Sequence, residues 1–188
     1  MERTYLEKHW RGIALGVAAM AVFVTASNFL VEIQISAWLT YGALTYPGAF
    51  LVTDLTNRAL GPAAARRVVY AGFALAVVLS LALANPRIAL ASGTAFLAAQ
   101  LLDITVFNRL RDKVWWAPPL VSSTLGSALD TALFFSLAFA FTDVPWVTLA
   151  IGDFGVKMGI ALFMLIPFRA LMAVIRPAFG SRVPANAA

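Results

Sequence analysis

The sequence contains no cysteine and one histidine in 188 residues. Without cysteine there are no disulfides, iron–sulfur clusters, thiolate zinc sites or cysteine nucleophiles. The histidine, His9, lies in the polar N-terminal segment, so haem ligation, a serine–histidine dyad and a histidine zinc site are excluded from the apolar part. We expect no metal, no cofactor and no enzymatic activity.

Charged residues are also scarce. Only 12% of the residues are charged, against about a quarter in a typical soluble domain. Apolar residues make up 61%, and the mean hydropathy is +0.84. This composition excludes an ordinary soluble enzyme and predicts a chain that lies almost wholly within a lipid bilayer.

Six apolar runs are each close to the roughly 20 residues that a membrane-spanning helix needs. They cover residues 12–31, 38–57, 68–84, 88–107, 120–141 and 146–171. We expect an all-α integral membrane protein, a single six-helix transmembrane domain over residues 1–188 with tails at 1–11 and 172–188. The first run is too long for a cleaved signal peptide, and its loss would leave an odd number of spans. Pro47, inside the second run, is expected to kink or break its helix.

The basic residues predict the orientation. Twelve of the 14 fall on one side if the spans alternate: Arg3, Lys8, Arg11, Arg58, Arg66, Arg67, Arg109, Arg111, Lys113, Arg169, Arg176 and Arg182. Arg87 falls on the other side, and Lys157 lies within a span. Because cytoplasmic loops attract Lys and Arg, both termini are expected in the cytoplasm and the protein in the inner membrane. The net charge of +5 then reflects topology and not nucleic-acid binding.

Two glycine motifs predict close helix packing. Gly12-x-x-x-Gly16 and Gly155-x-x-x-Gly159 allow backbones to approach each other. We favour contacts within the bundle, and a homodimer is possible.

Five ionisable residues lie within the predicted spans: Asp54, Asp103, Asp130, Asp153 and Lys157. Each costs about 2.5–3.5 kcal/mol at the centre of a membrane helix on insertion scales, so such residues indicate a substrate or ion path. Asp153 and Lys157 are four residues apart in the favoured order, so they can neutralise each other within one helix. Alternatively, Lys157 reaches Asp130 or Asp103 and acts as a counter-ion that a substrate displaces.

Helical spacing places aromatic, amide and hydroxyl side chains beside three of the carboxylates. The stripes are Tyr46, Phe50, Asp54 and Asn57 in the second span, Phe96, Gln100, Asp103 and Phe107 in the fourth, and Ser123, Ser127, Asp130, Thr131 and Phe134 in the fifth. Such stripes suit a pocket for a flat, hydrogen-bonding, partly apolar ligand. The alternative is that the polar residues only join helices and that the aspartates pair with Lys or Arg.

Longer motifs resemble one family. They are Gln100-Leu-Leu-Asp103 with Phe107-Asn108-Arg109, Trp115-Trp116-Ala-Pro118, Ser123-Thr124 followed by Asp130, Phe50–Thr56 and Asp153-Phe-x-x-Lys157. Together they resemble the queuosine precursor transporters of the vitamin uptake transporter group. The resemblance implies uptake of 7-cyano-7-deazaguanine (preQ0) and 7-aminomethyl-7-deazaguanine (preQ1). It also implies a fold similar to the substrate-binding components of energy-coupling-factor transporters.

The matching motif positions are Asp54, Gln100, Asp103, Asn108, Arg109, Ser123, Thr124, Asp130, Asp153 and Lys157. Many relatives have an acidic residue shortly after the second-span aspartate, where this chain has Asn57-Arg58. We expect Asp103 or Asp130 to accept the N1–H and 2-amino donors of the base. Gln100 or Asn28 then faces O6, and aromatic residues such as Phe107 and Tyr46 stack on the ring.

The excess of buried carboxylates over Lys157 favours the cationic preQ1 and a link to protons. No P-loop is present, so an ATP-driven step would need a partner protein. The alternative functions are therefore the substrate-binding subunit of an ATP-driven vitamin uptake complex and, from another class, an intramembrane enzyme that uses paired aspartates. An aspartyl protease of this kind needs Gly-x-Gly-Asp, and Ala150-Ile151-Gly152-Asp153 lacks the first glycine.

Overall fold

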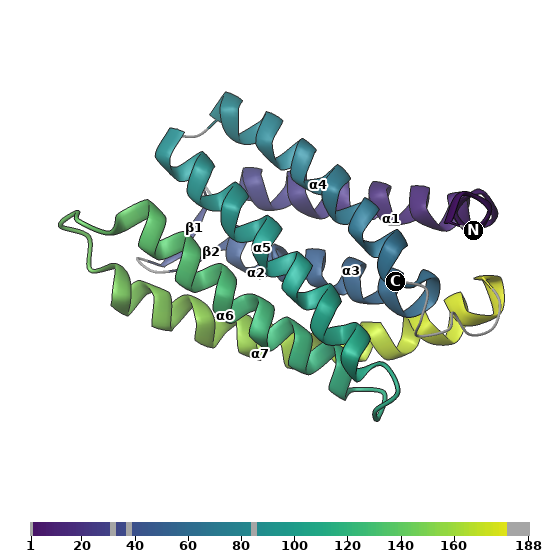
Figure 1. The fold of residues 1–188 in the computed structure, drawn as a ribbon. Coiled ribbons are helices and arrows are strands. Elements are labelled where there is room, and N and C mark those ends of the chain that lie inside the picture. The colour runs from purple at the N-terminus through teal and green to yellow at the C-terminus, as the bar shows by residue number, and fades with distance from the viewer. Residues whose placement is uncertain (1, 31–32, 37–38, 84–85, 180–188) are drawn as a thin grey trace.

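The structure, a computed structural model, describes residues 2–30, 33–36, 39–83 and 86–179 (Figure 1). Its helices are α1 (Glu2–Leu30), α2 (Tyr41–Thr45), α3 (Pro47–Leu60), α4 (Pro62–Leu83), α5 (Pro86–Leu110), α6 (Ala117–Phe139) and α7 (Trp146–Phe179). A short antiparallel hairpin of β1 (Gln34–Ser36) and β2 (Leu39–Thr40) lies between α1 and α2 in the chain. Apart from this hairpin, the elements of the described residues are helices, as the sequence predicts.

Proline marks the start of several helices. Pro47, Pro62 and Pro86 are the first residues of α3, α4 and α5, and Pro118 and Pro119 lie in the first turn of α6. The first residues of a helix donate no intrahelical hydrogen bond, so the missing N–H of proline costs nothing there. These prolines mark helix starts that the apolar runs by themselves do not show.

The continuous helix predicted over residues 38–57 is wrong. Leu39 and Thr40 form β2, α2 ends at Thr45, and a new helix begins at Pro47. The predicted break at Pro47 is confirmed. Because Pro47 has no N–H to continue the hydrogen bonds of α2, the next backbone bond runs from Ala49 to the carbonyl of Tyr46, at 3.0 Å.

Five helices of the described part are long and apolar enough to cross a membrane, namely α1, α4, α5, α6 and α7. They follow one another around α3, and each contacts it (Figure 1). Eleven of the 14 residues of α3 are buried. The short helix is therefore the centre of the bundle.

Unlike a soluble protein, this chain buries many polar side chains and exposes many large apolar ones. Thr53, Asn57 and Gln100 are fully buried, whereas Ile151 and Val174 are highly exposed. Lipid solvates apolar side chains and not polar ones, so a membrane protein turns its few polar groups inward.

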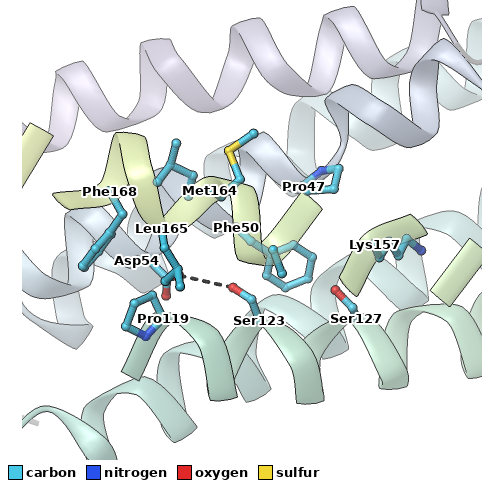
Figure 2. Close-up of a pocket in the computed structure, with 12 residues that line it drawn as sticks. Pro47, Phe50, Asp54, Pro119, Ser123, Ser127, Lys157, Met164, Leu165 and Phe168 are labelled. Atoms are coloured by element: carbon cyan, nitrogen blue, oxygen red, sulfur yellow. Dashed lines mark hydrogen bonds between the residues drawn. The ribbon is translucent and has the colours of Figure 1, made fainter. Parts of the chain in front are cut away.

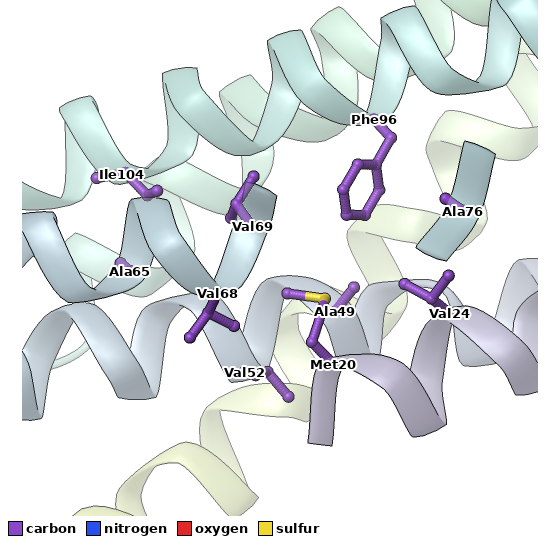
Figure 3. Packing of buried hydrophobic residues seen from close by; sticks show 10 residues of the cluster. All are labelled: Met20, Val24, Ala49, Val52, Ala65, Val68, Val69, Ala76, Phe96 and Ile104. Atoms are coloured by element: carbon purple, nitrogen blue, oxygen red, sulfur yellow. The ribbon is translucent and has the colours of Figure 1, made fainter. Parts of the chain in front are cut away.

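One side of α3 packs against α1, α4 and α5 through an apolar cluster (Figure 3). Its members are Met20, Val24, Ala49, Val52, Ala65, Val68, Val69, Ala76, Phe96 and Ile104. A Cβ added to Gly16 would lie 2.9 Å from Val68 and 3.0 Å from Thr56, so this glycine lets α1 approach both α3 and α4. The other face of α3 is left for α6 and α7.

The second glycine motif is not part of this packing. A Cβ added to Gly155 or Gly159 meets nothing within 4 Å. The expectation of a contact within the bundle is therefore wrong for these two residues, which lie open on the outer face of α7. Homodimer formation stays a prediction.

Basic side chains gather at one end of the bundle. The start of α1, the α3–α4 junction, the α5–α6 loop and the end of α7 meet there (Figure 1). We call it the basic end; it includes Arg11, Arg58, Arg66, Arg67, Arg109, Arg111, Lys113 and Arg169. Arg87 lies at the opposite end and donates to the carbonyls of Leu137 and Ala140, at 2.9 and 2.6 Å.

Candidate functional site

The break between α2 and α3 positions Tyr46. Its hydroxyl donates to Oδ1 of Asp130 on α6, at 2.9 Å. Its ring lies edge-on to Phe50 and Phe96, with centroid separations of 6.2 and 6.3 Å. These contacts hold a phenol group at the interruption of the helix.

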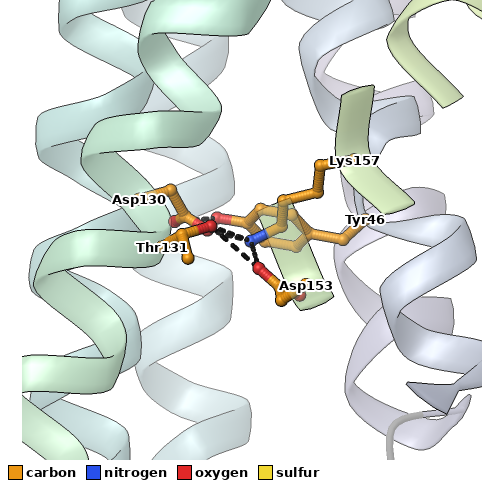
Figure 4. A network of polar contacts seen from close by, with 5 residues as sticks. All are labelled: Tyr46, Asp130, Thr131, Asp153 and Lys157. Atoms are coloured by element: carbon orange, nitrogen blue, oxygen red, sulfur yellow. Dashed lines mark hydrogen bonds and ion pairs between the residues drawn. The ribbon is translucent and has the colours of Figure 1, made fainter. Parts of the chain in front are cut away.

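A polar network joins Tyr46 to α6 and α7 (Figure 4). The ammonium of Lys157 lies 2.8 Å from Asp130 and 2.6 Å from Asp153. It also donates to the hydroxyl of Thr131 at 3.1 Å, and that hydroxyl donates to Asp153 at 2.8 Å. We call these five side chains the lysine network.

The two alternatives that the sequence left open for Lys157 are both realised. One ion pair lies within α7 and the other crosses to α6. The ammonium also lies 5.5 Å from the centroid of the Tyr46 ring, a cation–π distance. With all three ionised, two carboxylates share one cation, so the network has a negative charge that a cationic solute can offset.

A second polar group lies where α3, α5 and α6 meet. Ser122 and Ser123 donate to the two carboxylate oxygens of Asp54, at 3.3 and 3.2 Å. Asp103 lies on α5 between Gln100, which accepts from Thr53 of α3, and Ile104, whose carbonyl accepts from Asn57 of α3 at 3.1 Å. Both aspartates and both serines are buried. We call Asp54 and Asp103 the carboxyl pair.

Several buried polar atoms near the carboxyl pair have no hydrogen-bond partner within the described part of the chain. They are Nε2 of Gln100 and both carboxyl oxygens of Asp103. The other amide atom of Gln100, Oε1, accepts from Thr53 at 2.6 Å. A buried polar atom left unpaired costs about 1–3 kcal/mol, so a bound proton or solute that pairs it is stabilised there.

A pocket between α3, α6 and α7 touches both polar groups (Figure 2). Its cavity volume is about 20 Å³, room for about one water molecule, so a larger ligand fits only if the surrounding helices move apart. Its polar lining consists of Asp54, Ser123, Ser127 and Lys157, and its aromatic lining of Phe50 and Phe168. Apolar side chains of the same three helices complete the wall.

Gly126 makes room for one of these rings. A Cβ at this position of α6 would lie 2.7 Å from Cε1 of Phe50 and 3.3 Å from the carbonyl oxygen of Ala99. The absence of a side chain therefore allows Phe50 to lie against α6 at the edge of the pocket.

Toward the basic end, hydrogen bonds join the end of α3 to the residue that follows α5. The guanidinium of Arg111 donates to the side-chain oxygen of Asn57 at 2.8 Å and also to its backbone oxygen. Arg58 donates to the carbonyl of Arg111, and Arg111 donates to that of Arg58 at 3.3 Å. The bond to the carbonyl of Arg58 satisfies a group whose helical partner four residues on, Pro62, has no N–H.

A second pocket, with a cavity volume of about 200 Å³, opens at the basic end. Its lining consists of Arg58, Trp115, Phe168, Arg169, Met172 and Ala173. Phe168 lines this pocket and the central one, so its ring separates the two. The ring also packs against Phe107, at 6.3 Å between centroids.

Comparison with known proteins identifies the family of this chain. The chain matches the protein family described as "Putative vitamin uptake transporter" over residues 40–84 and 80–172. It is 34% identical over 173 residues to the queuosine precursor transporter of Escherichia coli (strain K12), covering 77% of this chain and 78% of that protein. The chain belongs to the queuosine precursor transporter family.

Two further relatives have the same kind of name. A probable queuosine precursor transporter of Haemophilus influenzae is 33% identical over 185 residues, covering 77% of this chain and 79% of that protein. One of Bacillus subtilis (strain 168) is 26% identical over 186 residues, covering 83% and 79%. No solved structure matches significantly. The family resemblance inferred from the motifs is confirmed, and this member is a membrane transporter and not an enzyme.

The transporter brings together only part of the site set expected from its sequence. Three of the expected residues line the central pocket, namely Asp54, Ser123 and Lys157. Three others belong to the lysine network, which reaches the pocket through Lys157: Tyr46, Asp130 and Asp153.

The remaining expected residues lie outside the pocket lining. Gln100 and Asp103 are fully buried near Asp54, and Phe107 lies behind Phe168. Thr124 is half-buried on α6. Asn28 belongs to α1, and its side chain lies outside the described part of the structure.

Sequence reasoning missed most of the residues that α7 contributes to the lining of the central pocket. Met164, Leu165 and Phe168 line the pocket and follow Lys157 at helical spacing, so the same-face rule applied to Lys157 would have found them. The bonds between Arg111 and Asn57 had no such signal, because they join two helices through a single tertiary contact. Within the described residues, no group of three His, Cys, Asp or Glu side chains is placed to hold a metal ion.

Proposed function

We propose that this chain imports 7-deazaguanine precursors of queuosine across the inner membrane. The relatives named for queuosine precursors support the choice of substrate. The observation that carries the proposal is the central pocket, in which a buried carboxylate, two hydroxyls and two aromatic rings face one space. A planar base with donors on one edge needs this combination.

Asp54 is the carboxylate that we assign to the base. It lines the pocket, whereas the residues favoured from sequence, Asp103 and Asp130, do not. The N1–H and 2-amino groups of a deazaguanine lie side by side and suit the two oxygens of one carboxylate. Ser127 then faces O6 as a hydroxyl donor, and the ring lies between Phe50 and Phe168.

The charge of the site favours preQ1 over preQ0. The lysine network holds one ammonium between two carboxylates, and Lys157 faces the pocket. The aminomethyl group of preQ1 is cationic, so it offsets this negative charge, whereas the cyano group of preQ0 does not.

We place the basic end in the cytoplasm, because Lys and Arg are retained on that side of bacterial inner membranes. Residues 41–60, comprising α2, the break and α3, rise about 30 Å at roughly 1.5 Å per residue, enough for one crossing. With the five long helices this element makes six crossings and puts both termini in the cytoplasm. The proposed similarity to the substrate-binding components of energy-coupling-factor transporters rests on the sequence motifs.

The test uses cells that lack both precursor synthesis and their own importer. Expression of this chain is expected to restore queuosine in tRNA when preQ1 or preQ0 is supplied, at lower concentration for preQ1. Asp54→Asn is expected to abolish the gain. Asp143→Asn, an exposed aspartate in the α6–α7 loop, is the matched control and should behave as wild type.

The amount of each variant in the membrane is measured alongside. No queuosine with wild-type protein present in the membrane would refute the function. Normal queuosine with Asp54→Asn would refute only the role of Asp54. Exchange of labelled for unlabelled precursor by the purified chain in liposomes, without ATP, separates this function from that of a subunit of an ATP-driven complex.

A further inference from the structure

The two pockets follow one another along α7. Side chains between residues 157 and 168 line the central pocket, and side chains between residues 168 and 173 line the pocket at the basic end. Among the described residues, Phe168 alone belongs to both linings. Lys157 and Phe168 lie at opposite ends of the central pocket (Figure 2). A solute that moves from the central pocket toward the basic end therefore passes the Phe168 ring.

The pockets differ in size. The cavity volume is about 20 Å³ in the central pocket and about 200 Å³ in the pocket at the basic end. The first has room for about one water molecule and the second for several. Trp115 and Phe168 give the larger pocket an aromatic lining, which suits a planar base. The structure is thus closed around the central pocket and hollow on the far side of the Phe168 ring.

Different chemistry closes the two ends of the central pocket. Away from the basic end, the lysine network joins α6 and α7 through ion pairs of Lys157 at 2.8 and 2.6 Å. Toward the basic end, Phe168 is 3% exposed and packs in an apolar cluster with Leu51, Phe107 and Met172. Its contact with Phe107 is edge-on, at 6.3 Å between centroids. Apolar contacts of one ring are individually weak, whereas separating buried ion pairs leaves uncompensated charges, so the end closed by Phe168 opens at the smaller cost.

We propose that the Phe168 ring is the inner gate of the solute path, and that the pocket at the basic end is the vestibule through which the solute leaves. This inference rests on the proposed function, in which the solute binds against Asp54. When the ring leaves Phe107, the central pocket and the vestibule join. The lysine network remains intact during this movement, so the other end of the central pocket stays closed. The solute then reaches one side of the membrane at a time, as a transporter requires.

Single thiols report access to each pocket, because the native chain has no cysteine. Ala161→Cys puts a thiol in the central pocket, and Ala173→Cys puts one in the vestibule. Inside-out membrane vesicles, which expose the cytoplasmic face, are treated with a cationic, impermeant methanethiosulfonate. We expect fast reaction at residue 173 and slow reaction at residue 161. Adding Phe168→Ala should make residue 161 react severalfold to about tenfold faster, because the aromatic pair with Phe107 no longer holds the gate closed.

A matched control separates the gate from a general loosening of α7. Phe163→Ala is the same substitution on the same helix, where the ring is 63% exposed and lines neither pocket. It should leave the reaction at residue 161 unchanged. In intact spheroplasts, which expose the outer face, residue 161 should react slowly with or without Phe168→Ala, because the lysine network closes that end.

A second measurement tests the vestibule with Phe168 in place. Purified Ala173→Cys and Val174→Cys proteins are modified in detergent with a bulky maleimide and then reconstituted in liposomes. Modification at residue 173 should block most exchange of radiolabelled for unlabelled preQ1 and preQ0, because the adduct fills the vestibule. Val174 is 70% exposed and lies outside the pocket lining, so modification there should leave exchange unchanged.

The two measurements can each refute the inference. Equal reaction at residue 161 with and without Phe168→Ala, an equal effect of Phe163→Ala, or faster reaction from the outer face would overturn the gate. Exchange undiminished by the adduct at residue 173, or blocked equally at residue 174, would overturn the vestibule even if Phe168→Ala does not fold. In each case, exchange by the native chain leaves the proposed function standing. If the native chain exchanges neither precursor, the proposed function is wrong and the gate falls with it.

Discussion

Replacing Lys157 by Met tests whether the lysine network is electrostatically balanced. Methionine fills a similar volume but removes the cation that lies 2.8 Å from Asp130 and 2.6 Å from Asp153. Both carboxylates then remain in the bundle with only the hydroxyls of Tyr46 and Thr131 as partners. We expect a strong loss of stability and of uptake.

The magnitude follows from the distances. At an effective dielectric constant of about 20, each ion pair contributes about 6 kcal/mol of Coulomb attraction, part of which offsets desolvation. Removing one partner of a buried pair costs about 3–5 kcal/mol, because a charge is left uncompensated. Tyr46→Phe removes one hydrogen bond within the membrane and should cost about 0.6–2 kcal/mol.

The assay is thermal unfolding in detergent, followed by the intrinsic fluorescence of the five tryptophans. For a chain of this size Lys157→Met should lower the melting temperature by roughly 6–20 °C. The double variant Lys157→Met with Asp153→Asn restores the original net charge of the network, so it should melt above Lys157→Met alone. If Lys157→Met costs no more than Tyr46→Phe, or if the double variant is the less stable, the electrostatic reasoning is refuted.

Two further predictions follow from the fold. Because the native chain has no cysteine, Asp112→Cys and Asp143→Cys provide single thiols in loops at opposite ends; in intact spheroplasts an impermeant maleimide should label only the second, and the reverse pattern would invert the proposed topology. Gly126→Ala should weaken precursor binding severalfold, because its Cβ would displace the Phe50 ring from the pocket wall. Gly155→Ala has nothing within 4 Å and should bind as wild type, so equal binding by both variants would contradict the assigned pocket.

Much of the fold could be predicted from local features. Long apolar runs predicted the five helices that can span a membrane, and the basic residues predicted which helix ends meet. Pro47 predicted the interruption of the second run. The start of that run was wrong, since Leu39 and Thr40 pair with β1 instead of extending a helix. Apolar residues suit either structure, so hydropathy alone did not separate them.

The site was predicted less completely, for a geometric reason. Helical spacing found which residues share a face with Asp54, but not which helix that face meets. The sequence therefore favoured Asp103 and Asp130 for the base, whereas the pocket lies against Asp54 and Ser123. Nor does spacing show that Tyr46 bonds to a residue 84 positions away.

Composition and periodicity by themselves determined that this is a membrane bundle with its few charges turned inward and its basic residues at one end. Each of these properties depends on the residues of a single helix and on whether lipid or water surrounds it. The tertiary structure alone decided how those charges are partnered: Lys157 bridges Asp130 and Asp153, while Asp54 accepts from two serines of α6. Such pairing depends on the rotation and depth of each helix against its neighbours, which are fixed by contacts such as that of Gly126 with Phe50 and not by any local pattern.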